Sequence, residues 1–170
     1  MRKLQVLFGL AIIGLLSTSA FAAPVQFTRS LVQEVPNAVV LTYDPADGHL
    51  SVGGNGLNIS TLEMTSAGAK FIPGGIPAGT ISPPFDVATA AKIFKLSTGG
   101  FPSLDLGLAY PGAMSGDDLI ADLKVDGSKL PSGNLAQGGG CGPYLYVVPE
   151  PSSLALIFCG LLGMLKIRRK

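Results

Sequence analysis

Glycine and proline divide this chain into short segments, and that division limits the fold more than any other sequence feature. The 170 residues include 23 glycines and 13 prolines, with glycine pairs at residues 53–54, 74–75 and 99–100. Both residue types favour turns and are unfavourable inside helices. No long window between the two ends has a clear helical period. Short segments bounded by turn residues are typical of all-β sandwiches and barrels.

The apolar residues within the segments favour strands, because they form short runs or alternate with polar residues. The predicted strands include residues 38–43, 104–108, 119–125 and 145–148. Residues 86–96 are ambiguous, since their alanines favour a helix and their β-branched residues a strand. The sequence therefore predicts an all-β protein with a single β-sandwich, Ig-like or jelly-roll-like, over residues 23–146.

Two turns are predicted in detail. In the segment Asp44–Gly48, Pro45 presets φ and Gly48 accepts a left-handed conformation, which favours a hairpin between the flanking apolar segments. Asp126–Gly127 predicts a second turn that ends the strand at 119–125. No repeat of constant period is visible, so the pattern does not indicate a solenoid or propeller.

The N-terminus has the three parts of a secretion signal. Arg2 and Lys3 precede an apolar segment at residues 4–16, and small residues follow up to Ala20 and Ala22. The apolar segment would form about 20 Å of helix, short of the roughly 30 Å hydrocarbon core. Residues 1–22 are therefore predicted to be a signal peptide, removed by signal peptidase between Ala22 and Ala23, rather than a retained membrane helix.

The C-terminus also has three parts. Pro149-Glu150-Pro151 comes first, and its prolines favour an extended peptide that a processing enzyme can thread through its cleft. An apolar segment then predicts a transmembrane helix at about residues 152–167. The chain ends in a basic cluster, which the positive-inside rule places in the cytoplasm. Its members are Lys166, Arg168, Arg169 and Lys170.

Together these three parts resemble the PEP-CTERM sorting signal of Gram-negative and planctomycete-type bacteria, over residues 147–170. The resemblance implies that Pro149, Glu150 and Pro151 are the motif recognised by exosortase, a membrane-embedded cysteine-type transpeptidase. They would be substrate residues and not catalytic ones. It also implies export through the inner membrane, a membrane-anchored ectodomain outside the cytoplasm, and a final place at the cell surface or in the extracellular matrix with exopolysaccharide. The alternative is an ordinary tail anchor after a proline-containing linker.

A second resemblance concerns the ectodomain. Residues 41–52, followed by residues 62–66 and Phe71, resemble ectodomains that precede this tail in planctomycete-like proteins. Those domains are similar to cohesin-like or carbohydrate-binding-like β-sandwiches. The resemblance implies a fold and does not name a ligand.

The sequence excludes several chemistries. His49 is the only histidine, so it would have to serve in any Ser-His-Asp or Cys-His arrangement, whereas its place after a turn favours a solvated loop residue. Histidine-rich zinc sites are excluded. Of the two cysteines, Cys159 lies in the apolar tail, so neither a disulfide framework nor a sulfur-rich metal site is expected, and Cys141 is predicted to be a free thiol.

Acidic residues offer two weaker hypotheses. Asp44 and Asp47 place hard oxygen ligands in one glycine-containing turn, which would suit calcium, with Asp117-Asp118 as a second candidate. Turn formation also explains Asp44 and Asp47 without a metal, and no other cofactor is predicted. A glycosidase needs only two carboxylates, for which Glu34, Glu63 and any of the aspartates are candidates.

The region between the two ends contains more acidic than basic residues and no basic run, which argues against a nucleic-acid partner. Tyr144 and Tyr146 share one face of a predicted strand, as packing residues or as a sugar-stacking platform. We therefore expect a noncatalytic surface or matrix-associated protein. The alternative is a binding module for a polysaccharide or a protein, with or without calcium. A third hypothesis is a glycoside hydrolase-like enzyme with two carboxylates.

Overall fold

The computed structural model describes residues 24–135 and 143–150. One sheet, here called sheet A, contains β1 (Val25–Gln26), β5 (Asn58–Ser66), β6 (Val87–Ala88), β7 (Lys92–Phe101) and β9 (Leu123–Leu130). Sheet B contains β2 (Thr28–Ser30), β3 (Val40–Asp44), β4 (His49–Gly53), β8 (Ser103–Gly107) and β10 (Tyr144–Val147). A 3-10 turn η1 (Pro73–Gly75) and one helix α1 (Gly116–Asp122) complete the elements.

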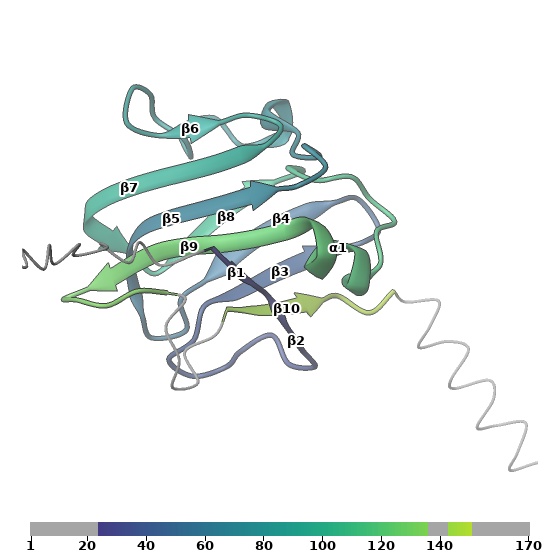
Figure 1. Ribbon diagram of the computed structural model, residues 1–170, viewed down its shortest axis with the longest axis horizontal. Helices are drawn as coiled ribbons and strands as arrows, with labels where there is room; N and C mark the ends of the chain where they lie inside the picture. Colours follow the sequence, from purple (N-terminus) through teal and green to yellow (C-terminus); the bar gives the residue numbers. More distant parts are fainter. Residues whose placement is uncertain (1–23, 136–142, 151–170) are drawn as a thin grey trace, which may run out of the picture.

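The two sheets lie in layers, with sheet A in front of sheet B in Figure 1. The strand order is β1-β9-β5-β7-β6 in sheet A and β2-β10-β3-β4-β8 in sheet B. The prediction of a mainly β structure with two sheets is confirmed for the described residues, which also include the helix α1. Within the described ranges no helix has the length and apolar character needed to cross a membrane.

Alternate residues of the strands form one core between the sheets. Leu62 and Met64 of β5 are fully buried, while Glu63 between them points to the outer face. Leu41 and Tyr43 of β3 supply the same core from sheet B. This arrangement follows from the two-residue period of a strand, which sends successive side chains to opposite faces.

The predicted hairpin at Asp44–Gly48 is confirmed. It joins β3 to β4, whose antiparallel register runs from Val40 opposite Gly53 to Asp44 opposite His49. Gly48 has φ of +83°, and a Cβ there would lie 1.9 Å from the Tyr110 backbone oxygen. Glycine is therefore required by conformation and by space at this position.

The predicted strand at 119–125 is wrong in its first half, since residues up to Asp122 belong to α1 and β9 begins at Leu123. The Ser115 hydroxyl caps α1 by accepting a hydrogen bond from the Asp118 backbone N–H at 3.1 Å. Such a cap satisfies one of the free N–H groups of the first helical turn. Leu119 and Leu123, four residues apart, are both fully buried, which suits a helical face as well as a strand.

The predicted turn at Asp126–Gly127 is also wrong, because β9 continues through it to Leu130 alongside β5. A Cβ on Gly127 would lie 2.2 Å from the Thr61 backbone oxygen, and the β5–β9 register shifts between Ile59 and Thr61. The glycine thus permits close approach at a bulge, a common role for glycine within a strand. The ambiguous segment 86–96 contains β6 and the first half of β7.

Several predictions fall outside the described residues. These are the signal peptide with Ala20, Ala22 and Ala23, the thiols Cys141 and Cys159, Pro151, the transmembrane helix, and the basic residues Lys166, Arg168, Arg169 and Lys170.

Candidate functional site

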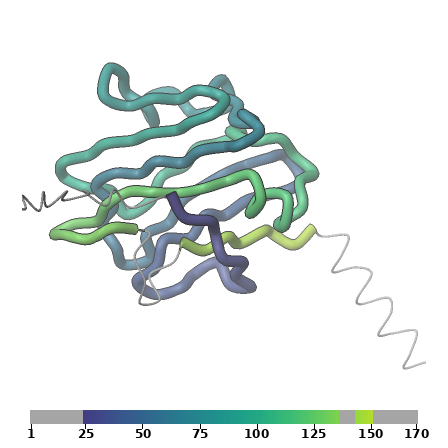
Figure 2. The backbone as a smooth tube through the Cα atoms, viewed as in Figure 1, coloured from purple at the N-terminus to yellow at the C-terminus, as the bar shows by residue number. Residues whose placement is uncertain are grey.

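The last described strand lies inside a sheet rather than at its edge. β10 pairs in parallel with β3 on one side and with β2 on the other, so that Tyr146 lies between Thr42 and Ser30. In Figure 2 the purple start of the described chain crosses the yellow-green last strand, where β2 and β10 pair. Leu145 of this strand is fully buried in the core. The end of the domain is therefore held by two neighbours that are distant in sequence.

Backbone pairing continues just past β10 and then stops. The Val148 N–H donates to the Tyr43 carbonyl at 2.8 Å. The next residue is Pro149, which has no N–H to extend the ladder. Pro149 and Glu150 consequently leave the sheet as an exposed, non-helical segment.

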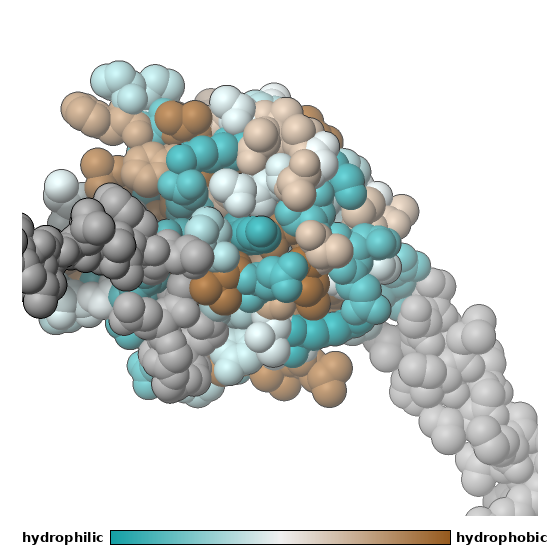
Figure 3. All heavy atoms as spheres, viewed as in Figure 1, coloured by the Kyte–Doolittle hydropathy of each residue, from teal (hydrophilic) through white to brown (hydrophobic). Residues whose placement is uncertain are grey.

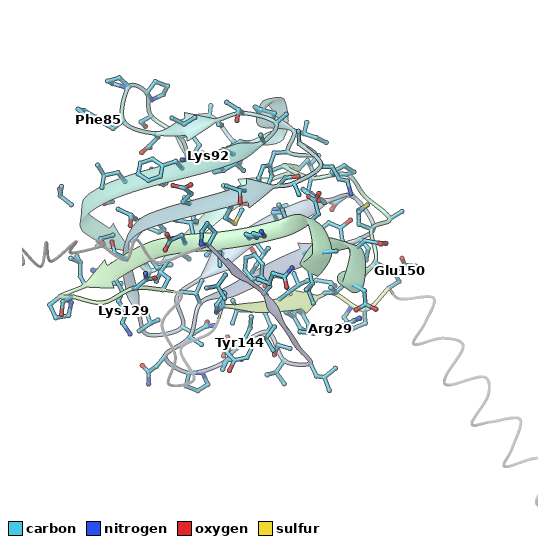
Figure 4. All side chains as sticks on the ribbon, in the orientation of Figure 1. Arg29, Phe85, Lys92, Lys129, Tyr144 and Glu150 are labelled. Carbon is cyan, nitrogen blue, oxygen red and sulfur yellow. The ribbon has the colours of Figure 1, made fainter. Side chains whose placement is uncertain are left out.

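A hollow of about 390 Å³ lies beside this exit. Its walls come from the end of β2, the start of α1 and the residues that follow β10; they include Arg29, Leu31, Gly116, Val148 and Glu150. Figure 4 shows Arg29 and Glu150 at the same end of the molecule.

Arg29 crosses from β2 toward α1 at this hollow. Its guanidinium lies 3.3 Å from the Asp117 carboxylate, and both side chains are more than half exposed. A Cβ on Gly116 would lie only 3.0 Å from the Arg29 Cζ, so the small residue at the helix start leaves room for the arginine. Because the pair is exposed, we expect it to contribute at most about 1 kcal/mol to stability.

Tyr43 fixes the loop before α1, and Met114 of that loop also lines the hollow. Its hydroxyl donates to the Pro111 carbonyl at 2.6 Å and accepts from the Met114 N–H at 3.1 Å. Burial raises the pKa of the Tyr43 hydroxyl, more than the Met114 hydrogen bond lowers it. The ring packs edge-on against Tyr110 with centroids 6.2 Å apart. The loop before α1 is thus tied to the strand that pairs with β10.

A buried polar network centred on Asp122 lies at the junction of α1 and β9. The carboxylate accepts hydrogen bonds from the Ser66 hydroxyl at 2.5 Å, the Gly68 N–H at 2.7 Å and the Tyr110 hydroxyl. Lys70 Nζ lies 3.9 Å away. Burial acts to raise the pKa of Asp122, but these hydrogen bonds and Lys70 lower it overall. The pKa of Tyr110 is raised by burial and by the neighbouring carboxylate.

Asp86 forms the second buried network. It accepts from the backbone N–H groups of Ser82 and Leu96 and from Lys95 Nζ, at distances of 2.9 to 3.1 Å. Burial acts to raise its pKa, and these donors lower it below the usual range. The network joins the loop before β6 to β7. Neither alternation nor composition distinguishes these two acidic residues from surface carboxylates.

With this geometry established, comparison with protein families gives one result. Residues 147–170 match the PEP-CTERM protein-sorting motif. The match begins at Val147, which is the last residue of β10 in sheet B. It supports an exported protein directed to exosortase processing and associated with the membrane or cell surface. Comparisons with curated proteins and with solved structures found no match.

The sorting motif begins one residue before the described domain ends its backbone pairing. Pro149 and Glu150 lie on the surface beside the hollow, as a segment that a processing enzyme must reach would be expected to lie. Sequence reasoning placed the domain boundary at 146–147, and the structure extends β10 through Val147.

The side chains of the calcium candidates Asp44 and Asp47 form hydrogen bonds within the hairpin itself. Asp44 accepts from the Ala46 N–H and Asp47 from the His49 N–H, each at 2.9 Å. Across residues 24–135 and 143–150, no group of three or more His, Cys, Asp and Glu side chains is placed to hold a metal ion. In the second candidate pair, Asp117 contacts Arg29. A calcium site stays a prediction.

The remaining candidates lie on the outer faces of the sheets. His49 Nε2 is 3.1 Å from Asp105 Oδ1, and both side chains are partly exposed. Glu63 pairs with Lys92 at 2.9 Å and lies opposite Asp126 in the β5–β9 register. These two carboxylates border a shallow hollow of about 240 Å³ on sheet A, rather than facing each other across a cleft.

Tyr144 and Tyr146 are half-buried on the outer face of sheet B, with Leu145 between them in the core. A row of polar side chains crosses this face in register. It runs through Ser30, Tyr146, Thr42, Ser51 and Asp105. A second hollow of about 270 Å³ lies on the same face and includes Thr42, Ser51 and Asp105.

Proposed function

We propose that this chain is a noncatalytic surface or matrix-associated protein whose two-sheet domain is exported, held at the membrane by its tail, and processed by exosortase at Pro149-Glu150-Pro151. We include in the proposal an Ig-like or jelly-roll-like class for the domain. The observation that carries the proposed processing is that backbone pairing ends at Val148, directly before Pro149. Cutting beyond that point would remove no strand from either sheet.

The state of the acidic residues supports a noncatalytic domain. Asp86 and Asp122, the buried carboxylates among the described residues, are each held by three donors that belong to the fold. A general acid needs a raised pKa near the working pH, whereas the pKa of both groups is lowered. The arrangement suits structural carboxylates.

Mass spectrometry of the protein from cells that contain exosortase tests the proposal. The wild type and a Glu34→Ala control should lack residues beyond Pro151, whereas Glu150→Ala should keep them. Glu34 is a suitable control because it is exposed and outside the motif. A wild-type protein that retains its tail, or a Glu150→Ala variant that is processed like the wild type, would contradict the proposal.

A polysaccharide-binding role is the second candidate, favoured by the row of hydroxyl, aromatic and carboxylate groups across the outer face of sheet B. The resemblance to carbohydrate-binding-like ectodomains points the same way. A glycan array probed with the exported protein, with and without calcium, tests this role. Binding that is lost in Thr42→Ala and kept in Thr65→Ala, on the outer face of sheet A, would favour it. No binding to any glycan would refute it.

A further inference from the structure

An exposed apolar projection lies at the end of the domain where the sorting tail begins. Leu31 is 92% exposed and Val32 is 57% exposed, directly after β2. Figure 3 shows brown, apolar surface over the end of β2. A leucine held almost entirely in water gains nothing from the fold that displays it. Single exposed apolar residues are common on protein surfaces, so the case for a partner depends on where this pair lies.

The projection has a defined conformation. The Ser30 hydroxyl donates to the Val32 carbonyl at 2.8 Å and accepts from the Val32 N–H at 3.2 Å. These two hydrogen bonds close a tight turn around Leu31, and the turn holds the leucine side chain outward. Ser30 is itself fixed, because β2 pairs with β10 in sheet B.

The projection lies beside the point where the tail begins. β2 and β10 are parallel with Ser30 opposite Tyr146, so Leu31 follows Ser30 as Val147 follows Tyr146. Leu31 and Pro149 border the same hollow. The four residues from Val148 to the start of the predicted transmembrane segment can span at most about 14 Å. The headgroup layer of one leaflet takes up about 5–8 Å of that distance.

From this placement we propose that Leu31 and Val32 insert into the outer surface of the lipid bilayer while the tail is anchored, so that the end of the domain rests on the membrane. The inference rests on the proposed anchoring of the chain. It adds a specific contact that sets the orientation of the domain and keeps Pro149-Glu150 at the level of the headgroups, where a membrane-embedded enzyme works.

Apolar insertion, rather than charge, would provide the contact. The surrounding groups have both signs, with Arg29 paired to Asp117 and Glu150 nearby. No cluster of basic residues marks this end of the described chain, in contrast to surfaces that bind anionic lipids electrostatically. Apolar side chains of peripheral proteins enter the headgroup and acyl boundary by about 5–10 Å, which two adjacent side chains can reach.

The absence of tryptophan from the chain gives a clean test. Leu31→Trp places a single reporter on the projection. Phe85→Trp is the matched control, because Phe85 is also exposed, at 72%, and Figure 4 shows it at the opposite side of the domain from Arg29 and Glu150. Both variants, in the exported form without residues 1–22 and with the tail intact, are reconstituted in phosphatidylcholine vesicles, with or without lipids brominated near the top of the acyl chains. Flotation is measured first.

We expect both variants to float with the vesicles. Emission from Leu31→Trp should shift to shorter wavelength and lose most of its intensity with brominated lipid, while emission from Phe85→Trp should keep the wavelength of an indole in water. If the chains float and both reporters behave alike, the inference is wrong and the anchoring stands. A chain that does not float overturns the anchoring and the inference together. A shift at residue 31 that requires added exosortase would identify the enzyme, and not lipid, as the occupant.

Discussion

Replacing Asp122 by asparagine should be among the most damaging conservative changes in the domain. The carboxylate accepts from the Ser66 hydroxyl, the Gly68 N–H and the Tyr110 hydroxyl in a site that is 7% exposed. A hydrogen bond to a buried charged group contributes about 1.5–3 kcal/mol. Asparagine keeps one acceptor oxygen but turns an NH₂ group toward the donors. We expect a loss of about 3 kcal/mol from a total of about 5–15 kcal/mol.

Pulse proteolysis of the membrane-anchored chain in increasing urea measures this loss without removing the tail. At a slope of about 2 kcal/mol per molar urea, the midpoint should fall by about 1.5 M. Asp117→Asn is the control, because Asp117 is 88% exposed and its ion pair should contribute at most about 1 kcal/mol. Equal midpoints for the two variants would refute the assignment of Asp122 as the centre of a stabilising network.

The pH dependence gives a second measurement on the same variant. Because the pKa of Asp122 is lowered in the folded state, its contribution is present above the ordinary aspartate pKa of about 3.9 and is lost as the pH falls through the folded-state value. The wild type should therefore lose stability more steeply than Asp122→Asn below about pH 4. Parallel curves would show that the carboxylate is not held in its charged form.

Two further changes test the local structure. Gly48→Ala should destabilise the domain by about 2 kcal/mol or more, because φ is +83° and a Cβ would lie 1.9 Å from the Tyr110 oxygen. Gly74→Ala is the control and should have a mild effect, because nothing lies within 4 Å of its Cβ. Equal urea midpoints for the two variants would contradict the expected clash. Ser115→Ala should cost about 1 kcal/mol by removing the cap on α1. Ser115→Thr should restore most of that loss, and an unchanged midpoint in the alanine variant would show that the cap does not stabilise the helix.

Some elements could be predicted because their signals are local. The turn at Asp44–Gly48 depends on a few adjacent residues, and the structure places it between β3 and β4 as expected. The cap of α1 was also present in the sequence, as Ser115 three residues before Asp118. It was missed because Leu119 and Leu123 fit a period of two as well as a helical spacing, and the strand interpretation was preferred.

Other features depend on residues that are far apart in the chain. Asp122 and Asp86 look like ordinary surface carboxylates until Ser66 and Lys95 are brought to them. Gly127 resembles a turn residue until β5 approaches it closely enough to exclude a Cβ. Alternation identifies which face of a strand is apolar, but the partner of each strand depends on packing over the whole domain.

The clearest contrast is between the sorting tail and the strand that precedes it. Contiguous residues specify the tail, since proline geometry and the match at residues 147–170 need no folded partner. Nothing in residues 144–147 indicates that they insert in parallel between β2 and β3. That placement arises because burying Leu145 and satisfying the backbone on both sides require two strands from the other end of the chain, and only the folded domain brings them together.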